Sequence, residues 1–318
     1  MEDGSRIRLG IIGLGVMGAE MLEVAQRHPQ FEVVAAADPS TRAVASARTA
    51  HPGPAYVDDA DELLGHHPLD AVYIASPPAT HARYAIRAME AGLAVFAEKP
   101  LAVDLAEGRE MVRVAAATGA PNALNFVLSD RAAALAVGDA LQKGQIGTIR
   151  GIELRFTFPQ WPRAFQESAG WVAGRAQGGF LREVASHYLF LTDRLLEPLE
   201  PVHTHVTYGA RAEDTAYGLF LAGDVPVTLS GQVAAGPETY EWTLLGTERS
   251  YRITDWARLW LGDEQGWIPA DVDEPRGSEH TRLSEFARAV RGEDTTLADF
   301  AAGLRVQELV EHFHRENR

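Results

Sequence analysis

The sequence predicts an α/β protein in which a doubly wound parallel sheet is followed by an α+β domain with a largely antiparallel sheet. Three observations predict this class. Strand and helix signals alternate along the first part of the chain, a glycine-rich turn joins the first strand to the first helix, and alternating half-buried strands follow later. We expect the boundary near residue 122, which gives two domains, 1–122 and 123–318.

The first domain is expected to alternate strands with helices. Residues 7–12 form an aliphatic run that suits a strand buried on both faces. Asp104 is a residue type that caps helix N-termini, and Gly92 and Gly119 stand where two helices would end. The expected strands are 7–12, 32–37, 71–75, 94–97 and 121–126, and the expected helices are 17–27, 40–49, 58–64, 80–91 and 104–118.

The second domain lacks the regular alternation of strand and helix signals seen in the first. A strand with one buried face is expected at 149–158, followed by a loop rich in Trp, Pro and Gly and then by several short alternating segments. The expected helices are 129–143, 180–196, 283–291 and 297–314. His312 and His314 are expected on a solvated tail, and His203 with His205 lack the accompanying ligands of a metal site, so no metal is predicted.

Composition excludes several classes of function. The 318 residues carry 29 Lys and Arg against 44 Asp and Glu, a formal charge of −15, which disfavours nucleic acid and anionic membranes as partners. The chain has no cysteine, which excludes disulfides, thiolate nucleophiles and iron–sulfur ligation. No apolar run is long enough to span a membrane, and Met1 to Arg8 lack the pattern of a signal peptide. We expect a cytoplasmic protein.

A glycine turn follows the first strand and opens the first helix. It has the spacing GxGxxG: Gly13 allows the tight turn, Gly15 allows a pyrophosphate to approach the backbone, and Gly18 allows the helix to pack on the strand. Val16 and Met17 complete the turn, where the helix N-terminus offers N–H groups to phosphates. The turn predicts a dinucleotide site.

Two residues bear on the choice of dinucleotide. Asp38 ends the second strand, where a carboxylate accepts hydrogen bonds from the adenosine ribose and repels a 2′-phosphate, which favours NAD. Arg42 follows one helical turn later and is able to engage a 2′-phosphate, although a solvated helix position explains it more simply. NAD is therefore expected, with NADP left open.

Two further segments make the chain recognisable. They are Ala75-Ser76-Pro77-Pro78-Ala79-Thr80-His81, with Glu98-Lys99-Pro100 after the next strand, and Gly178-Gly179-Phe180-Leu181-Arg182-Glu183-Val184-Ala185-Ser186-His187, preceded by Trp171. Together with the glycine turn, their order resembles the glucose-fructose oxidoreductase/inositol dehydrogenase (Gfo/Idh/MocA) family. The resemblance is strong over residues 7–122, fair around 171–190 and weak after about 200.

The resemblance implies a Rossmann domain and a C-terminal domain with an open sheet. It implies an NAD(P)-dependent dehydrogenase or reductase of sugars, cyclitols or related polyols, and a homodimer or homotetramer assembled through that sheet. Lys99 matches the family's catalytic lysine, whose bond to the next proline is often cis. A lysine just past a strand end is able to stabilise a developing alkoxide. Glu98 and Lys99 are also candidates for the cofactor site, and Glu98 is expected to pair with Lys99 or with another cation.

His187 matches the family's catalytic histidine, and histidine titrates in the range useful for proton transfer. Glu183 precedes it by four residues, on the same helix face, where it would orient the imidazole or bind a substrate hydroxyl. Many members have aspartate there. In this chain Phe180 also stands where the motif has its third glycine, and Phe190 stands where many members have a later acid. These departures leave the role of Glu183 open.

The remaining candidates line the expected cofactor and substrate sites. Ser76, Pro77 and His81 belong to the loop that the resemblance places near the nicotinamide. Asn125, Arg163 and Trp171 are candidate substrate contacts, because amides and guanidinium groups bind polar substituents and aromatic rings stack on sugars. The basic pair that often follows Asn125 is missing, so we expect a pocket unlike that of typical inositol or glucose enzymes.

Three functions fit these residues. The first is hydride transfer between nicotinamide and a sugar, cyclitol or related small molecule, with His187 moving the hydroxyl proton and Lys99 polarising the oxygen. The second is an NAD-dependent glycosidase on the same scaffold, which would release an aglycone without net redox change. The third is a non-catalytic NAD(P) sensor that reports to a protein partner, against which the intact Lys99 and His187 argue.

Overall fold

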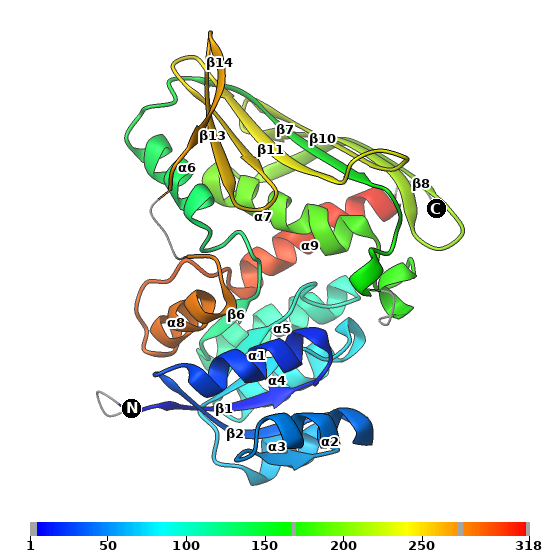
Figure 1. Cartoon of the computed structure of the whole chain (residues 1–318), viewed down its shortest axis with the longest axis vertical. Helices are drawn as coiled ribbons and strands as arrows, with labels where there is room; N and C mark the ends of the chain where they lie inside the picture. The colour runs from blue at the N-terminus through cyan, green and yellow to red at the C-terminus, as the bar shows by residue number, and fades with distance from the viewer. Residues whose placement is uncertain (1–4, 167–169, 273–275, 316–318) are drawn as a thin grey trace. The chain divides into compact units, whose positions relative to one another are not determined.

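The computed structural model describes residues 5–166, 170–272 and 276–315, so part of the segment Met1 to Arg8 lies outside the described residues. The chain divides into two compact units (Figure 1). The first contains Met1–Phe126 and Ser278–Leu304, and the second contains Val127–Gly277 and Arg305–Arg318. The prediction placed everything after residue 122 in one domain, whereas the structure returns Ser278–Leu304 to the first unit.

The first unit holds a six-stranded parallel sheet in the order β3-β2-β1-β4-β5-β6, which confirms the doubly wound fold. The order in which the strands are added to the sheet reverses between β1 and β4, and ligands of such sheets bind at this point, at the carboxyl ends of the strands. The strands are β1 (Ile7–Ile12), β2 (Phe31–Ala37), β3 (Ala55–Val57), β4 (Ala71–Ile74), β5 (Ala94–Ala97) and β6 (Asn122–Leu124). The short edge strand β3 was not predicted.

Helices cover this sheet and explain why residues after 277 join it. They are α1 (Val16–Arg27), α2 (Thr41–Ala50), α3 (Ala60–His66), α4 (His81–Glu90), α5 (Leu105–Thr118) and α8 (Glu279–Val290). Phe286 of α8 stacks on Phe31 and Phe96, with ring centroids 6.3 and 5.1 Å apart. These rings are fully buried, so α8 completes the hydrophobic core of the first unit.

The second unit holds an eight-stranded sheet in the order β14-β13-β12-β11-β7-β10-β9-β8. All of its neighbouring strands are antiparallel except the parallel pair β7 and β10, as the prediction of a mostly antiparallel sheet requires. The strands are β7 (Ile149–Phe158), β8 (Leu199–Tyr208), β9 (Glu213–Ala222), β10 (Val225–Val233), β11 (Thr239–Gly246), β12 (Ser250–Thr254), β13 (Arg258–Asp263) and β14 (Gly266–Ala270). Several are longer than the short segments expected.

One face of this sheet is covered by helices and the other is open. Figure 1 shows α7 (Ser186–Leu195) and α9 (Phe300–Arg315) along the covered face, and α6 (Ala132–Gln142) lies in the same unit. Trp242 of β11 is fully buried and donates a hydrogen bond from Nε1 to Thr192 of α7, at 2.9 Å. On the open face Tyr217, Leu219 and Leu221 of β9 remain exposed.

Two expectations from the sequence concern the end of the chain and the membrane. His314 is buried, and its Nδ1 lies 2.7 Å from the Tyr208 hydroxyl, so the expectation of a solvated tail was wrong. Phe313 packs on Phe220 and draws this part of α9 onto the sheet.

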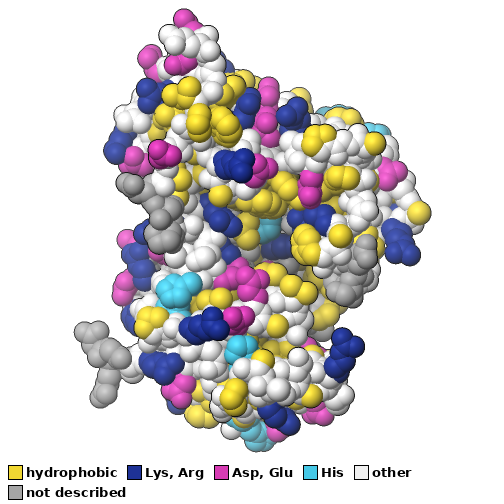
Figure 2. All heavy atoms as spheres, viewed as in Figure 1, with side chains coloured by type: hydrophobic (Ala, Val, Ile, Leu, Met, Phe, Trp, Pro, Cys, Tyr) yellow, Lys and Arg dark blue, Asp and Glu magenta, His cyan; other side chains and the backbone are white. Residues whose placement is uncertain are grey.

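Within the described residues, no helix is long and apolar enough to cross a membrane. On the face in Figure 2, acidic and basic side chains are interspersed.

Candidate active site

Steric contacts explain two glycines of the turn after β1. Gly13 has φ +95°, and a β-carbon there would lie 2.6 Å from the backbone of Ala75. A β-carbon at Gly18 would lie 1.9 Å from the carbonyl oxygen of Gly13. The turn therefore packs on itself and on the residue that follows β4.

Gly15 differs from its neighbours because a β-carbon there would meet no described atom within 4 Å. It is the N-cap of α1, and no side chain of the described residues caps this helix end. Val16 beside it is 62% exposed. Open backbone at a helix N-terminus, with no competing side chain, fits the pyrophosphate of a dinucleotide.

Asp38 ties the end of β2 to this turn. One carboxylate oxygen accepts a hydrogen bond from the backbone N–H of Leu14 at 2.7 Å, and the other accepts one from Ser40 at 2.8 Å. Each oxygen keeps a second lone pair for a ribose hydroxyl. Arg42 lies exposed in the first turn of α2. Its contribution to a 2′-phosphate stays a prediction.

His81 connects the loop after β4 with the loop after β5. Its ring is 1% exposed, with Nε2 2.9 Å from the Ser76 carbonyl and Nδ1 2.9 Å from the Pro100 carbonyl. Burial lowers the pKa of the imidazole. A neutral ring donates to only one of these carbonyls at a time. The Ser76 hydroxyl lies 2.7 Å from that of Thr80, so Ser76 and Pro77 belong to a bonded turn.

Lys99 follows β5 directly, and the Lys99–Pro100 peptide bond is cis, as the resemblance implied. Lys99 is half-buried and Pro100 is buried. Glu98, immediately before it, points into the protein and is 8% exposed. It accepts hydrogen bonds from the Tyr73 hydroxyl and from Asn125 Nδ2, the latter at 2.6 Å.

This buried network extends to α8. Asn125 is 2% exposed and its amide nitrogen also lies 3.2 Å from a carboxylate oxygen of Glu279, which is paired with Arg282. Burial, and secondly the charge of Glu279, raise the pKa of Glu98 to about 6. Asn125 thus binds two carboxylates in this structure, and its contact with substrate stays a prediction. Glu279 and Arg282 were missed because they lie more than 150 positions after Asn125 in the sequence.

In the second unit, Glu183 and His187 lie on one continuous helical segment. A π-helical turn, Leu181–Ala185, leads into α7, and such turns are frequent at functional sites. Both side chains are buried, at 5% and 3% exposure. The backbone N–H of Val127 donates to Nδ1 of His187 at 3.2 Å, which fixes one side of the imidazole.

Close packing explains the glycines before this helix. A β-carbon at Gly178 would lie 2.1 Å from the carbonyl oxygen of Val172, and one at Gly179, where φ is +96°, would lie 2.0 Å from a carboxylate oxygen of Glu213. Phe180 takes the place of the third glycine, and its ring occupies the space over Gly231. Burial raises the pKa of Glu213 to about 7.

A chain of polar contacts joins Glu183 to the loop after β7. Gln166 donates from Nε2 to Glu183 at 3.1 Å and accepts from Nε of Arg163 at 2.9 Å. Arg163 also lies 3.2 Å from the hydroxyl of Tyr240. The structure therefore brings Arg163 and Glu183 together through Gln166, which sequence reasoning missed because glutamine carries no chemical signature.

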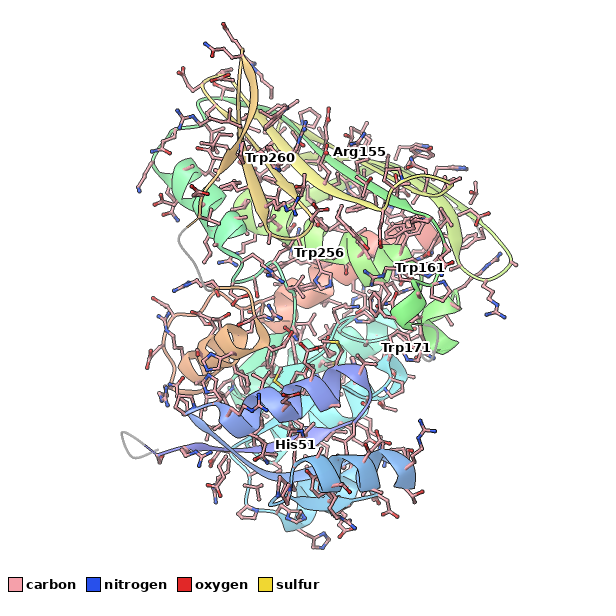
Figure 3. The ribbon with its side chains drawn as sticks, viewed as in Figure 1. His51, Arg155, Trp161, Trp171, Trp256 and Trp260 are labelled. Atoms are coloured by element: carbon pink, nitrogen blue, oxygen red, sulfur yellow. The ribbon has the colours of Figure 1, made fainter. Side chains whose placement is uncertain are left out.

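Aromatic rings surround the same helix. Trp256, labelled in Figure 3, comes from the turn between β12 and β13, and its ring meets His187 edge-on at 5.4 Å between centroids. It also contacts Tyr188 and Tyr240. Asp255 and Trp256 are the non-glycine residues with positive φ in the described part of the chain. Strained backbone of this kind is concentrated at functional sites, yet nothing in the sequence singled out Trp256.

Trp171 lies with Trp161 in the loop after β7, as Figure 3 shows. It is half-buried in the short turn Gly170–Ala173, and Trp161 donates from Nε1 to the Val172 carbonyl at 3.2 Å. The guanidinium of Arg163 lies 5.6 Å above the Trp161 ring. A polar and aromatic loop therefore accompanies Glu183, and the contact of Trp171 with substrate stays a prediction.

The predicted residues fall into two sets. The glycine turn, Asp38, Ser76, His81 and Lys99 occupy strand ends of the first unit, and Arg163, Trp171, Glu183 and His187 occupy the second unit. Among the described residues, no group of three His, Asp or Glu side chains is arranged to hold a metal ion. His203 and His205 lie exposed on β8.

Comparison with known proteins assigns both units. Residues 7–126 match the family described as oxidoreductase family, NAD-binding Rossmann fold, and residues 134–252 match the GFO/IDH/MocA C-terminal domain. A dTDP-3,4-didehydro-2,6-dideoxy-alpha-D-glucose 3-reductase from Streptomyces violaceoruber is 32% identical over 96% of this chain and 94% of its own. A 1,5-anhydro-D-fructose reductase from Ensifer adhaerens is 33% identical over 57% of this chain and 54% of its own.

Solved structures share the fold over the full length. The WlbA dehydrogenase from Bordetella pertussis, crystallised with NADH and UDP-GlcNAcA, has a TM-score of 0.83 and 23% identity, covering 99% of this chain and 97% of its own. The 3-ketoreductase KijD10 from Actinomadura kijaniata, crystallised with NADP and TDP-benzene, has a TM-score of 0.83 and 22% identity, covering 98% of each chain.

Proposed function

Since the chain belongs to the GFO/IDH/MocA oxidoreductase family, we propose that it reduces the keto group of a nucleotide-linked sugar. It is an NAD(P)-dependent oxidoreductase that transfers hydride between nicotinamide and a sugar or related polyhydroxylated molecule. The observation that carries the narrower proposal is the similarity to a dTDP-keto-sugar reductase along 96% of the chain. The glycosidase and sensor alternatives have no support from the comparisons.

The residues of the first unit fit the cofactor and the reacting oxygen. The bound nicotinamide supplies the hydride, and the open backbone at Gly15 with the end of α1 would hold its pyrophosphate. Lys99 would donate a hydrogen bond to the substrate oxygen and stabilise its negative charge as the carbonyl is reduced. The buried network under Glu98 supports the backbone from which Lys99 projects.

The residues of the second unit fit the sugar and its charged substituent. Glu183 is a hydrogen-bond acceptor for a sugar hydroxyl, and the rings of Trp161 and Trp171 offer stacking surfaces. Arg163 is a basic residue of this loop beside Gln166 and Tyr240, and guanidinium groups bind diphosphates in two-pronged geometry. We assign Arg163 to the diphosphate of the nucleotide.

The open face of the eight-stranded sheet favours assembly into a homodimer or homotetramer. Val202, Tyr217, Leu219 and Leu221 are between 38% and 52% exposed on neighbouring strands, and such contiguous apolar surface is typical of a protein interface. Light scattering of the wild type and of a Leu219→Asp variant tests this assembly. The cytoplasmic location also stays a prediction, testable by cell fractionation.

The first experiment measures nicotinamide absorbance with NADH and NADPH against keto-sugars linked to dTDP or UDP, and against the same sugars without nucleotide. The chain has two lysines, which gives a matched pair of variants. Lys99→Ala should lower kcat by about 10²-fold with cofactor affinity within a few-fold. Lys143→Ala, which removes an exposed pair with Asp139, should leave kcat unchanged.

Each outcome has a separate meaning. Turnover of nucleotide-linked keto-sugars only, lost in Lys99→Ala, establishes the proposal. Turnover of free sugars or cyclitols at equal efficiency contradicts the nucleotide-linked substrate and keeps the hydride transfer. Full turnover by Lys99→Ala contradicts the assignment of Lys99.

A further inference from the structure

The turn between β12 and β13 has a backbone conformation that its sequence does not favour. Asp255 and Trp256 have φ of +50° and +68°, and the N–H of Ala257 donates to the carbonyl of Thr254 at 3.2 Å. Positive φ at both central residues of such a four-residue turn is the pattern of type I′, which favours asparagine and glycine. A bulky residue at positive φ is strained. Tryptophan at position 256 therefore needs a reason other than formation of the turn.

The contacts of the Trp256 ring supply part of this reason. Its indole meets the imidazole of His187 edge-on, with the ring centroids 5.4 Å apart. It also packs on Tyr188 and Tyr240, with centroids 5.1 Å apart in each pair. The backbone N–H of Asp255 donates to the Tyr240 carbonyl at 3.1 Å, which holds the turn against β11. The turn thus directs the indole to the part of α7 that carries His187.

Packing alone does not account for the indole. Trp256 is half-buried, whereas His187 beneath it is 3% exposed, so part of the tryptophan stays accessible. Trp161, Trp242 and Trp260 each donate from Nε1 to an oxygen of the protein. In the described part of the chain, no residue accepts a hydrogen bond from Nε1 of Trp256. An apolar ring face and a polar N–H are therefore both available to a ligand.

We propose that Trp256 is a substrate-binding residue whose indole stacks on the sugar ring and donates from Nε1 to a sugar hydroxyl. This inference deepens the proposed function and rests on it. The imidazole of His187 is expected to meet the reacting hydroxyl, and Trp256 contacts that imidazole, so a sugar bound at His187 lies within reach of the indole. A sugar ring presents carbon-bound hydrogens on its faces, and these pack well on an aromatic ring.

The neighbours of Trp256 give the bound substrate a direction. Tyr240 contacts the indole, and its hydroxyl lies 3.2 Å from the guanidinium of Arg163. Contacts therefore run from His187 through Trp256 and Tyr240 to Arg163, all within the second unit. With the sugar at Trp256 and the diphosphate at Arg163, this order matches the order of the two groups in a nucleotide-linked sugar.

Variants of Trp256 test the stacking by kinetics. Trp256→Phe keeps a ring and loses the N–H, and Trp256→Leu keeps an apolar side chain and loses both features. We expect KM for the sugar to rise about 3-fold in Trp256→Phe and about 10-fold or more in Trp256→Leu. The value of kcat should stay within about 3-fold, because stacking holds substrate and transition state alike. An unchanged KM in Trp256→Leu contradicts the inference.

The matched control is Trp267→Leu. Trp267 is another half-buried tryptophan of the second unit, on β14, where the guanidinium of Arg252 lies 4.0 Å from its ring centroid. Its replacement removes a similar ring away from His187 and should leave KM for the sugar unchanged. An equal rise of KM in Trp267→Leu and Trp256→Leu would show a general effect on the fold, and it contradicts the inference.

A second measurement needs no turnover. The NAD⁺-bound protein is labelled with fluorotryptophan, and the fluorine resonance of Trp256 is assigned as the one absent from Trp256→Phe. It is followed on addition of dTDP-glucose, of glucose and of dTDP. We expect a shift with dTDP-glucose and none with dTDP. A shift with dTDP alone, or none with any of the three, contradicts the inference. A shift with glucose but not with dTDP-glucose supports the inference and contradicts the nucleotide-linked substrate, so the two failures are distinguishable.

Discussion

The two units hold their functional side chains by different means. In the first unit the glycine turn, Asp38, Ser76 and Lys99 each follow a strand of the parallel sheet, so the backbone itself delivers them to one edge. In the second unit His187 and Glu183 depend on partners 60 and 17 residues away, Val127 and Gln166. Local sequence motifs therefore position the functional side chains of the first unit, and tertiary contacts position those of the second.

Glycine-to-alanine substitutions test this difference most strongly. Gly179→Ala places a β-carbon 2.0 Å from the Glu213 carboxylate at a positive φ, and we expect it to lower the free energy of unfolding by about 3 kcal/mol or more. Gly15→Ala meets no described atom and should leave that free energy within about 1 kcal/mol while weakening cofactor binding by at least about 10-fold. Urea unfolding and cofactor titration measure both quantities.

The controls are built into this pair. Gly15→Ala serves as the stability control for Gly179→Ala, and Gly179→Ala, if it folds, serves as the affinity control for Gly15→Ala. An unfolding free energy unchanged in Gly179→Ala would show that the glycine before the helix is not required for packing. Unchanged cofactor affinity in Gly15→Ala would remove the pyrophosphate from this turn.

The same difference between local motifs and tertiary contacts determined which features could be predicted from the sequence. The parallel sheet, the glycine turn and Lys99 were predictable because turn sterics and strand ends act over a few residues. The return of α8 to the first core was not, since Phe286 meets Phe31 and Phe96 across most of the chain. The burial of His314 was also not predicted. The spacing of His312 and His314 does not indicate that α9 packs on β8, whose side chains contact both histidines.

The site shows the contrast again. Glu183 and His187 were identified from a motif, but Gln166, Val127 and Trp256, which contact them, carry no recognisable pattern. Backbone N–H groups are present at every residue except proline, so the hydrogen bond from Val127 to His187 cannot be derived from any residue type. Only the three-dimensional structure shows it.

The buried carboxylate of Glu213 in the second unit is expected to make the free energy of unfolding depend on pH. Burial raises the pKa of Glu213 from 4.5 to about 7, so the folded chain holds this proton more tightly than the unfolded chain. The stabilisation is complete below about pH 4.5 and is lost as the pH rises to about 7, by up to about 3 kcal/mol. Glu213→Gln cannot ionise and should lack this loss.

The measurement is the difference in unfolding free energy between wild type and Glu213→Gln as a function of pH. It should move in favour of the variant between about pH 4.5 and about pH 7.5. Arg182, Tyr208, Glu311 and His314 surround Glu213. Glu153→Gln, at an exposed position on β7, is the matched control. A flat difference would show that folding does not raise the pKa of Glu213.

The smallest expected effect concerns the choice between NAD and NADP, which we expect to depend on Asp38 in the first unit. Asp38 places a negative charge at the end of β2, bound to the N–H groups of Leu14 and Ser40. Asp38→Ser removes the charge and keeps a hydroxyl acceptor for those donors. We expect the ratio of NADPH to NADH affinity to rise by about 10-fold, or about 1.4 kcal/mol, because a 2′-phosphate is no longer repelled.

Arg42→Ala, made alone and together with Asp38→Ser, shows whether the guanidinium contributes. If Arg42 engages a 2′-phosphate, its removal should cancel most of the gain in the Asp38→Ser background and leave NADH affinity unchanged. If Arg42 is a solvated helix residue, the gain survives. An unchanged cofactor ratio in Asp38→Ser would show that this carboxylate serves the turn of Leu14 alone, and that even in the first unit a residue at the expected position can act through structure and not through the ligand.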